Sequence, residues 1–176
     1  MKEITAEDRL YVKKAMLEIP DGPDGDRARG KLYEPFLRDY GENFKVATQA
    51  FIFNPNGLSV GNHVYIGFNS YLGQGEITLE DEVLIGNFVS ITASNHLIKN
   101  NSFRFGGYKE IPVYIGRGSW LGAHSSILAG VTLANTTLVA SGAIVTKSFE
   151  EEGIIIGGCP AEIISTVETF RNKYEI

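Results

Sequence analysis

Three histidines are the side chains of this chain best suited to exchange protons near neutral pH: His63, His96 and His124. A histidine that removes the proton of a hydroxyl group makes that hydroxyl a nucleophile, which is the chemistry of a general base. His96 differs from the other two because it directly precedes a long interval, Leu97–Pro112, that interrupts a regular pattern. The single cysteine, Cys159, excludes a disulfide or a cysteine-based zinc site within the chain.

The segment that carries these histidines repeats every six residues between Val60 and Thr146. An apolar residue opens each unit, a small residue often follows it, and the fifth place is small or β-branched. The opening residues are Val60, Ile66, Leu72, Leu79, Ile85, Ile91, Ile115, Leu121, Ile127, Leu133, Val139 and Val145. This period predicts an all-β solenoid in which three units close a coil of about 18 residues. Ordinary antiparallel strands would show a two-residue alternation instead.

The segments outside the regular repeat predict helices, an irregular first coil and one long loop. Ala6–Glu18 favours a helix, Pro20–Gly25 a turn-rich linker, and residues 27–38 a second short helical piece. Residues 45–53 lack clean repeats and are expected to cap the solenoid, while Leu97–Pro112 is expected to form a functional loop without regular structure. The expected division is an N-terminal helical segment over residues 1–40, the solenoid over 41–158, and a C-terminal tail over 159–176 with a helix in 161–174.

Composition and charge narrow the functional classes. Hydrophobic residues make up 43% of the 176 residues, but no apolar run approaches the roughly 20 residues of a transmembrane helix. The charged start, MKEITAEDRL, has no apolar signal region, so a cytoplasmic location is expected. A net charge of −5 argues against a nucleic-acid partner. Gly116-Arg117-Gly118 is interpreted as a corner of the solenoid and not as a phosphate-binding loop.

Several motifs occur in a fixed order along the repeat. They are Asn95-His96, Ile111-Pro112, Ser119-Trp120-Leu121-Gly122-Ala123-His124, Gly130-Val131-Thr132, Ile144-Val145-Thr146-Lys147 and Gly157-Gly158-Cys159-Pro160-Ala161. In this order they resemble the hexapeptide-repeat acyltransferases, and most of all the galactoside and maltose O-acetyltransferase group. The resemblance covers about residues 41–165. It implies a left-handed parallel β-helix, a homotrimer, and acetyl-CoA as the co-substrate.

The resemblance also implies roles for individual residues. His96 would act as the general base on an acceptor hydroxyl, in a direct transfer without a covalent acyl-enzyme. Coenzyme A would lie along a groove between coils and subunits, with Trp120 beside the pantetheine arm and Lys147 near a phosphate of the adenosine end. The full set of donor-side residues is Trp120, Gly122, Ala123, Ser141, Thr146 and Lys147. The acceptor-side residues are Asn69, Gln74, Asn95 and Tyr108.

Three positions depart from the pattern of the family. Gln74 stands where the galactoside group has a carboxylate, so the usual sugar of that group is in doubt. Glu162 stands where a basic residue is usual, and Ser148–Glu152 is acidic where the family has an acidic residue and prolines. An acidic run there would weaken the approach of the phosphates of coenzyme A.

The sequence leaves three functions open and argues against a metal site. The zinc-dependent carbonic anhydrases have a similar architecture, but they need three imidazoles around one metal. Here the histidines are 33 and 28 residues apart, neither a multiple of 18, so no metal is expected. The functions that remain are an O-acetyltransferase for a sugar or glycan precursor, an acyltransferase for a non-sugar acceptor (an antibiotic hydroxyl) or a sugar amine, and a catalytically silent solenoid.

Overall fold

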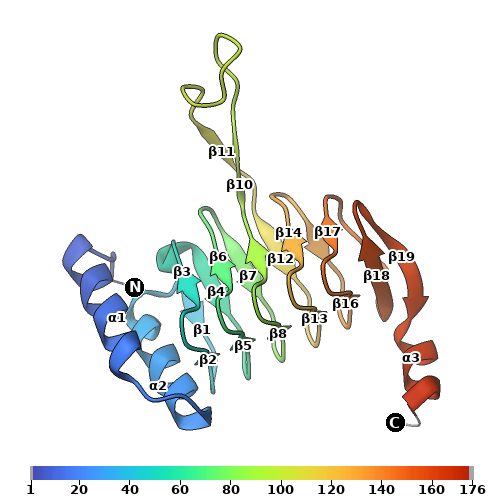
Figure 1. The fold of residues 1–176 in the computed structure, drawn as a ribbon, viewed down its shortest axis with the longest axis horizontal. Helices are drawn as coiled ribbons and strands as arrows, with labels where there is room; N and C mark the ends of the chain where they lie inside the picture. Colours follow the sequence, from blue (N-terminus) through green and yellow to red (C-terminus); the bar gives the residue numbers. More distant parts are fainter. Residues whose placement is uncertain (1, 175–176) are drawn as a thin grey trace.

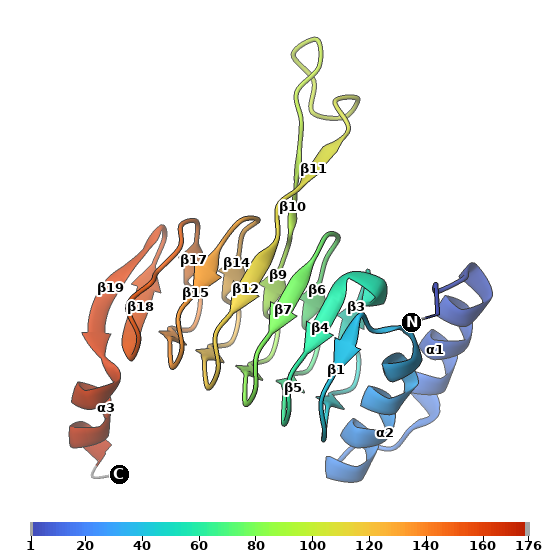
Figure 2. The same ribbon diagram turned by 180° about the vertical axis from the view of Figure 1, so that it is seen from behind.

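The computed structural model describes residues 2–174 and shows a three-sided parallel β-helix with helices at both ends (Figure 1). Met1, Glu175 and Ile176, which belong to the expected terminal segments, lie outside the described residues. Strands of successive coils pair in parallel and build three sheets, which are the three faces of a prism. The coil is left-handed, as the resemblance implies. The view from behind in Figure 2 shows the same stack of coils and a hairpin that projects from it.

Each sheet takes one strand from each coil. The first sheet contains β1 (Asp39–Tyr40), β4 (Leu58–Val60), β7 (Ile77–Leu79), β12 (Val113–Ile115) and β15 (Thr132–Leu133). The second contains β2 (Lys45–Val46), β5 (Tyr65–Ile66), β8 (Leu84–Ile85), β13 (Trp120–Leu121), β16 (Leu138–Val139), β18 (Ile154–Gly158) and β19 (Ala161–Thr166). The third contains β3 (Phe51–Ile52), β6 (Tyr71–Leu72), β9 (Ser90–Ile91), β14 (Ser126–Ile127) and β17 (Ile144–Val145).

The opening residues of the hexads form the core, as the repeat predicts. All of them from Val60 to Val145 are buried, and Leu121 pairs with Ile85 in the coil before it and with Val139 in the coil after it. Burying a side chain of this size stabilises the fold by roughly 1.5–3 kcal/mol. The small second residue has a steric cause, because a Cβ on Gly122 would lie 2.6 Å from the carbonyl oxygen of Val139.

The coils are longer at the N-terminal end than the expected 18 residues. Val46 pairs with Ile66 and Ile66 with Ile85, so these coils advance by 20 and 19 residues, whereas Leu121 and Val139 are 18 apart. The extra residues all lie at one edge of the prism, between the third and first sheets, where η2 (Pro55–Gly57) also forms. We call this the ribbon edge; it comprises residues 53–57, 73–76, 92–112, 128–131 and 146–149.

The two N-terminal helices cover the open end of the solenoid. Helix α1 runs over Ala6–Glu18, the range expected from the sequence, and Thr5 and Asp8 form a capping box at its start. Helix α2 (Pro23–Tyr33) starts earlier than the expected piece at residue 27, because Pro23 fits the first turn of a helix; it is followed by the 3-10 helix η1 (Glu34–Phe36).

Arg29 fastens these helices to the first coil. Its buried guanidinium donates to the carbonyl oxygens of Val46, Ile19 and Pro20 at 2.9, 3.0 and 3.2 Å, and it also pairs with Asp26. Such a buried charge is tolerated only because each of these donors has an acceptor. The contacts fix helix α2 against β2 and thereby close the apolar end of the prism.

The C-terminal segment differs from the single helix expected over residues 161–174. After a turn at Cys159-Pro160 the chain forms β19, which pairs antiparallel with β18, and only Val167–Tyr174 forms helix α3. The antiparallel strand supplies the backbone partners that the last coil lacks, which protects an edge that would otherwise stay open.

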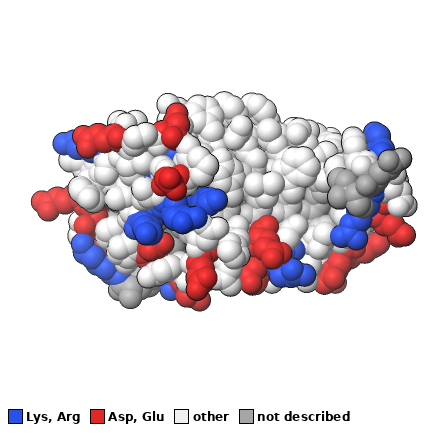
Figure 3. Space-filling model, turned by 90° about the horizontal axis from the view of Figure 1, so that it is seen from below, with Lys and Arg blue, Asp and Glu red and all other residues white. Residues whose placement is uncertain are grey.

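The described residues include no helix with both the length and the apolar character needed to cross a bilayer. On the face shown in Figure 3, basic and acidic side chains are intermixed, and a broad uncharged area lies beside them. The charged groups are therefore interspersed on this face and do not form one basic surface.

Candidate active site

His96 lies on a hairpin and not in an irregular loop. Strand β10 (Ser94–His96) pairs antiparallel with β11 (Tyr108–Glu110), and this two-stranded ribbon projects from the ribbon edge (Figures 1 and 2). The expectation that residues 97–112 have no regular structure is corrected here, because residues 108–110 pair with Ser94–His96, directly before that interval. His96 is directly opposite Tyr108, and Ser94 is opposite Glu110.

The register decides which side chains share a face of the ribbon. Directly opposite residues point to the same side, and successive residues alternate. His96, Tyr108, Ser94 and Glu110 therefore share one face, whereas Asn95 lies on the other. Of the two acceptor-side candidates on the ribbon, the structure brings Tyr108 to His96 and turns Asn95 away.

Gln74 lies directly beneath the ribbon. The Ala93 N–H donates to the carbonyl oxygen of Gln74 at 3.1 Å, and the Ile111 N–H donates to the carbonyl oxygen of Ala93 at 2.8 Å. The Gln74 side-chain Nε2 donates to Oε1 of Glu110 at 3.3 Å. Sequence reasoning missed Glu110, since its place beside Gln74 depends on the antiparallel pairing of β10 and β11, which the hexad pattern does not encode.

Asn69 lies on a different edge of the prism from His96. This second edge, between the second and third sheets, comprises residues 47–50, 67–70, 86–89, 122–125 and 140–143. Asn69 occupies a left-handed corner conformation there, with a φ of 55°, and its side chain is exposed. Asn69 and Gln74 bracket strand β6, whose exposed Tyr71 faces outward between them.

The donor-side candidates fall into two groups. Trp120 lies on β13 with 41% of its surface exposed, and Gly122, Ala123 and Ser141 follow on the second edge. The carbonyl oxygen of Ala123 already accepts the Gly142 N–H at 2.9 Å, so this carbonyl is occupied within the solenoid.

Thr146 and Lys147 lie on the ribbon edge, further along the solenoid than His96. Both carboxylate oxygens of Glu162 accept from Nζ of Lys147, at 2.8 and 2.7 Å. The ammonium group also lies 5.5 Å from the ring centroid of Phe149. The departure at Glu162 therefore has a structural consequence, because the carboxylate neutralises the lysine expected to meet a phosphate.

The other two histidines occupy exposed corners. His124 stacks on Phe88 with ring centroids 4.7 Å apart, and Nδ1 of His63 lies 3.0 Å from Nδ2 of Asn43. Both residues have a φ of 61°, the left-handed conformation of a solenoid corner. Within residues 2–174 no group of three or more histidine, cysteine or acidic side chains converges in a way that would hold a metal ion.

The expected site residues thus lie along two edges that flank the third sheet. The ribbon edge carries Gln74, His96, Thr146 and Lys147, and the second edge carries Asn69, Ala123 and Ser141. The donor-side candidates are thus divided between the two edges, with Thr146 and Lys147 on the edge of His96 and Ala123 and Ser141 on the other.

Comparisons with known proteins concern the sequence and the fold. The sequence matches no protein-family model. It is 27% identical over 176 residues to galactoside O-acetyltransferase of Escherichia coli (strain K12), which covers 99% of this chain and 86% of that protein. A galactoside acetyltransferase solved in complex with coenzyme A superposes with a TM-score of 0.78 at 24% identity, over 98% of this chain and 88% of that one.

A third comparison extends the same likeness. A hexapeptide-repeat-containing acetyltransferase from Vibrio cholerae O1 biovar eltor, complexed with acetyl coenzyme A, superposes with a TM-score of 0.73 at 23% identity, over 94% of this chain and 92% of that one. The likeness in sequence to a galactoside O-acetyltransferase, together with the shared fold, supports the assignment of the chain to the hexapeptide-repeat acetyltransferases. The relatives found are of the galactoside O-acetyltransferase type, which supports an acetyltransferase of that type.

Proposed function

We propose that this enzyme transfers the acetyl group of acetyl-CoA to a hydroxyl group of a sugar or glycan precursor, with His96 as the general base. The observation that carries the proposal is the pairing of His96 with Tyr108 on one face of a ribbon that stands directly above Gln74. An imidazole, a phenol and an amide within one polar surface suit a polyhydroxylated acceptor. The phenol ring also offers an apolar face to a sugar.

The chemistry needs one proton transfer and one tetrahedral intermediate. The His96 imidazole takes the proton of the acceptor hydroxyl while the oxygen attacks the thioester carbonyl carbon. The resulting oxyanion is stabilised by N–H donors. Collapse of the intermediate forms the ester, breaks the carbon–sulfur bond and releases coenzyme A, whose thiolate takes the proton from the imidazolium.

The donor would approach along the third sheet. Trp120 supports the pantetheine arm, Gly122 permits the close backbone approach at its corner, and Ala123 and Ser141 offer backbone groups to the pantetheine amides. Thr146 and Lys147 receive the adenosine end. The two solved structures of similar fold are complexes with coenzyme A and acetyl coenzyme A, which supports this choice of donor.

The working unit is proposed to be a homotrimer with sites shared between neighbouring chains. Two features support this. The base and most donor-side candidates lie on different edges of one chain, and the ribbon exposes large apolar side chains with no solenoid beneath them in the single chain (Figure 1). Those exposed side chains are Leu97, Ile98, Phe103 and Phe105. A neighbouring copy would cover them and bring the two edges together.

The test is acetyl-CoA thiol release against a panel of sugars, nucleotide sugars, amino sugars and hydroxyl-bearing antibiotics. His96→Ala is expected to keep its oligomeric state and to lower kcat by roughly 10²–10⁴-fold, the usual contribution of a positioned base. His63→Ala is the matched control, since this exposed histidine lies in the corner between the first and second sheets, away from both edges that carry site residues. Full activity of His96→Ala would refute the base, and transfer to amines alone would move the acceptor to a sugar amine.

A further inference from the structure

A cavity of about 230 Å³ lies between helix α1 and the first coil. Buried apolar side chains line it, among them Val12 and Met16 from one face of α1 and Ile52 from β3. Pockets for drug-sized ligands measure roughly 300–1,000 Å³, so this one is sized for a small molecule. None of the residues named as expected site residues lines it.

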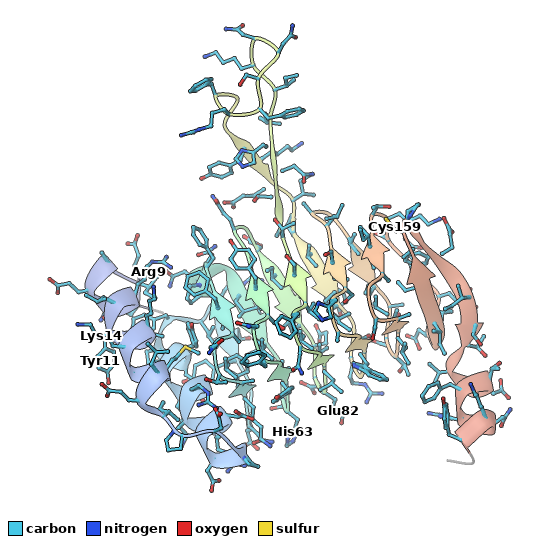
Figure 4. All side chains as sticks on the ribbon, viewed as in Figure 1. Arg9, Tyr11, Lys14, His63, Glu82 and Cys159 are labelled. Carbon is cyan, nitrogen blue, oxygen red and sulfur yellow. The ribbon has the colours of Figure 1, made fainter. Side chains whose placement is uncertain are left out.

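The rim of this cavity is basic. Arg9 and Lys13, one helical turn apart on α1, are the only charged residues among its lining side chains. The Arg9 guanidinium is held in place by the Phe53 carbonyl oxygen and lies 5.8 Å from the centroid of the Phe53 ring. Figure 4 shows Arg9 on the side of α1 toward the solenoid, with Tyr11 and Lys14 pointing away. A positive rim contrasts with the net charge of −5 of the whole chain.

A phenol completes the lining. Tyr33 is almost fully buried, and burial raises the pKa of its hydroxyl to about 12. The hydroxyl therefore stays protonated at neutral pH. The cavity thus combines an apolar lining with two cations and one phenol. The apolar lining suits the apolar part of an amphipathic anion, and the polar groups suit its charged end.

We propose that this cavity binds a small apolar molecule that carries a carboxylate, with the carboxylate at Arg9 and Lys13 and the apolar part against Val12, Met16 and Ile52. The interior of the cavity is apolar, and its cations lie only at the mouth. An apolar ligand with an anionic group is therefore favoured over a neutral or cationic ligand. The proposal does not depend on the proposed reaction.

A neighbouring copy of the ribbon is the competing occupant, since its tip exposes Phe103 and Phe105. The charges argue against it. The ribbon segment 97–109 contains Lys99, Arg104 and Lys109 and no acidic residue. Placing these cations beside Arg9 and Lys13 would bring like charges together, which is unfavourable.

The mouth of the cavity lies close to the acceptor-side surface. Phe51, which lines the cavity, stacks on Tyr71 with ring centroids 6.1 Å apart, and Tyr71 lies between Asn69 and Gln74 along the chain. The same ligand chemistry therefore has two sources: an apolar acid attached to the acceptor, or a free apolar acid that binds on its own.

The experiment is calorimetric titration of the full-length protein with octanoate, and with octanol as the uncharged analogue. Octanoate is expected to bind, and the double variant Arg9→Gln/Lys13→Gln is expected to weaken octanoate about tenfold while leaving octanol unchanged. Lys14→Gln, on the outward side of the same helix, is the matched control and should bind as wild type. Equal affinity of the wild type and the double variant for octanoate would overturn the proposal.

A second variant tests the cavity itself. Met16→Trp fills the space and should abolish binding of both compounds; if this variant does not fold, Ala50→Leu is used at the opposite wall. Binding that persists in a filled cavity would contradict the site. Binding that appears only after Phe103 and Phe105 are replaced by Ser would mean that the ribbon of another copy occupies the cavity, which also overturns the proposal.

Kinetics distinguish the two sources once binding is established. If octanoate inhibits the wild-type enzyme in competition with the acceptor, the cavity binds an apolar acid that is part of the acceptor. Octanoate that binds without altering KM for the acceptor supports a free ligand. The failure of thiol release with every acceptor would contradict the proposed reaction and leave the calorimetric result unaffected.

Discussion

Lys147 and Glu162 form an ion pair at the place where a phosphate of coenzyme A is expected. Both side chains are more than half exposed. Exposed ion pairs contribute about 0–1 kcal/mol, so a phosphate can displace the carboxylate. Glu150 and Glu151 line the same shallow hollow and add negative charge to it. The proposed donor end is therefore less favourable to phosphate than a lysine alone would be.

Glu162→Gln is accordingly predicted to lower KM for acetyl-CoA about three- to tenfold, because Lys147 no longer has a competing carboxylate. The measurement is initial rate against donor concentration, repeated with a donor that lacks the 3′-phosphate. The effect should disappear with that donor. Glu168→Gln, on helix α3, provides the control, and a KM shift of equal size with both donors would contradict the charge argument.

The proposed role of Glu110 depends on one contact, the hydrogen bond that its carboxylate accepts from Gln74. Its carboxylate accepts from Gln74 and shares a face of the ribbon with His96. We infer that a carboxylate in this place compensates for the uncharged Gln74, because it can offer acceptor lone pairs to a substrate hydroxyl.

Replacing Glu110 with Gln is predicted to raise KM for a polyhydroxylated acceptor about tenfold, without a change in KM for acetyl-CoA. The loss should be smaller for the deoxy analogue that lacks the hydroxyl bound by the carboxylate. Lys109→Gln changes the neighbouring residue on the other face of the ribbon and should behave as wild type. A uniform loss across all acceptors would instead indicate damage to the ribbon.

At the scale of the element, helix α1 depends on its first turn. The hydrogen bonds from Lys2 and Thr5 lower the pKa of the Asp8 carboxyl to about 2. A carboxyl whose pKa is lower in the folded than in the unfolded chain stabilises the fold above the unfolded value of 3.8. That stabilisation is lost as the pH falls through about 2.

Asp8→Asn should therefore be less stable than wild type above about pH 4, and the difference should vanish near pH 2. Urea unfolding followed by circular dichroism at a series of pH values measures it. Asp24→Asn is a suitable control, because Asp24 is an exposed aspartate in the first turn of α2 and forms no ion pair among the described residues. A stability difference that stays constant down to pH 2 would show that the capping box acts through geometry and not through charge.

At the scale of the whole molecule, the separation of the site residues on two edges has a direct consequence. In the proposed homotrimer, a chain that carries only a defective base would still offer an intact donor side to its neighbour. The reverse would hold for a chain with a defective donor side. Sites shared across a threefold axis can then be rebuilt from two different defective chains.

Coexpression of His96→Ala with Trp120→Ala is predicted to give mixed trimers with about a third of the wild-type activity, because each mixed trimer holds one intact site out of three. Each variant alone should be nearly inactive, and a chain carrying both changes should rescue neither. Purification by two different tags isolates the mixed trimers. An absence of rescue in such trimers would place the whole site within one chain.

Much of the architecture was predictable from the sequence because it depends on contacts that repeat locally. Each apolar residue at the start of a hexad meets its equivalents one coil away, so the period alone indicates a buried ladder and a parallel solenoid. The bounds of α1 follow from its capping residues and the proline after it. The place of the ribbon was also visible, because the repeat stops after His96 and resumes near Val113.

The remaining features depend on pairings between residues that no local pattern connects. The antiparallel register of β10 and β11 places His96 opposite Tyr108 and Glu110 above Gln74. The cavity beneath α1 exists only because a helix packs against a coil that is distant in sequence. The sequence by itself thus determined the solenoid, because its contacts repeat with the period of the chain. The tertiary structure decided which polar groups meet, because those contacts depend on how distant segments pack against one another.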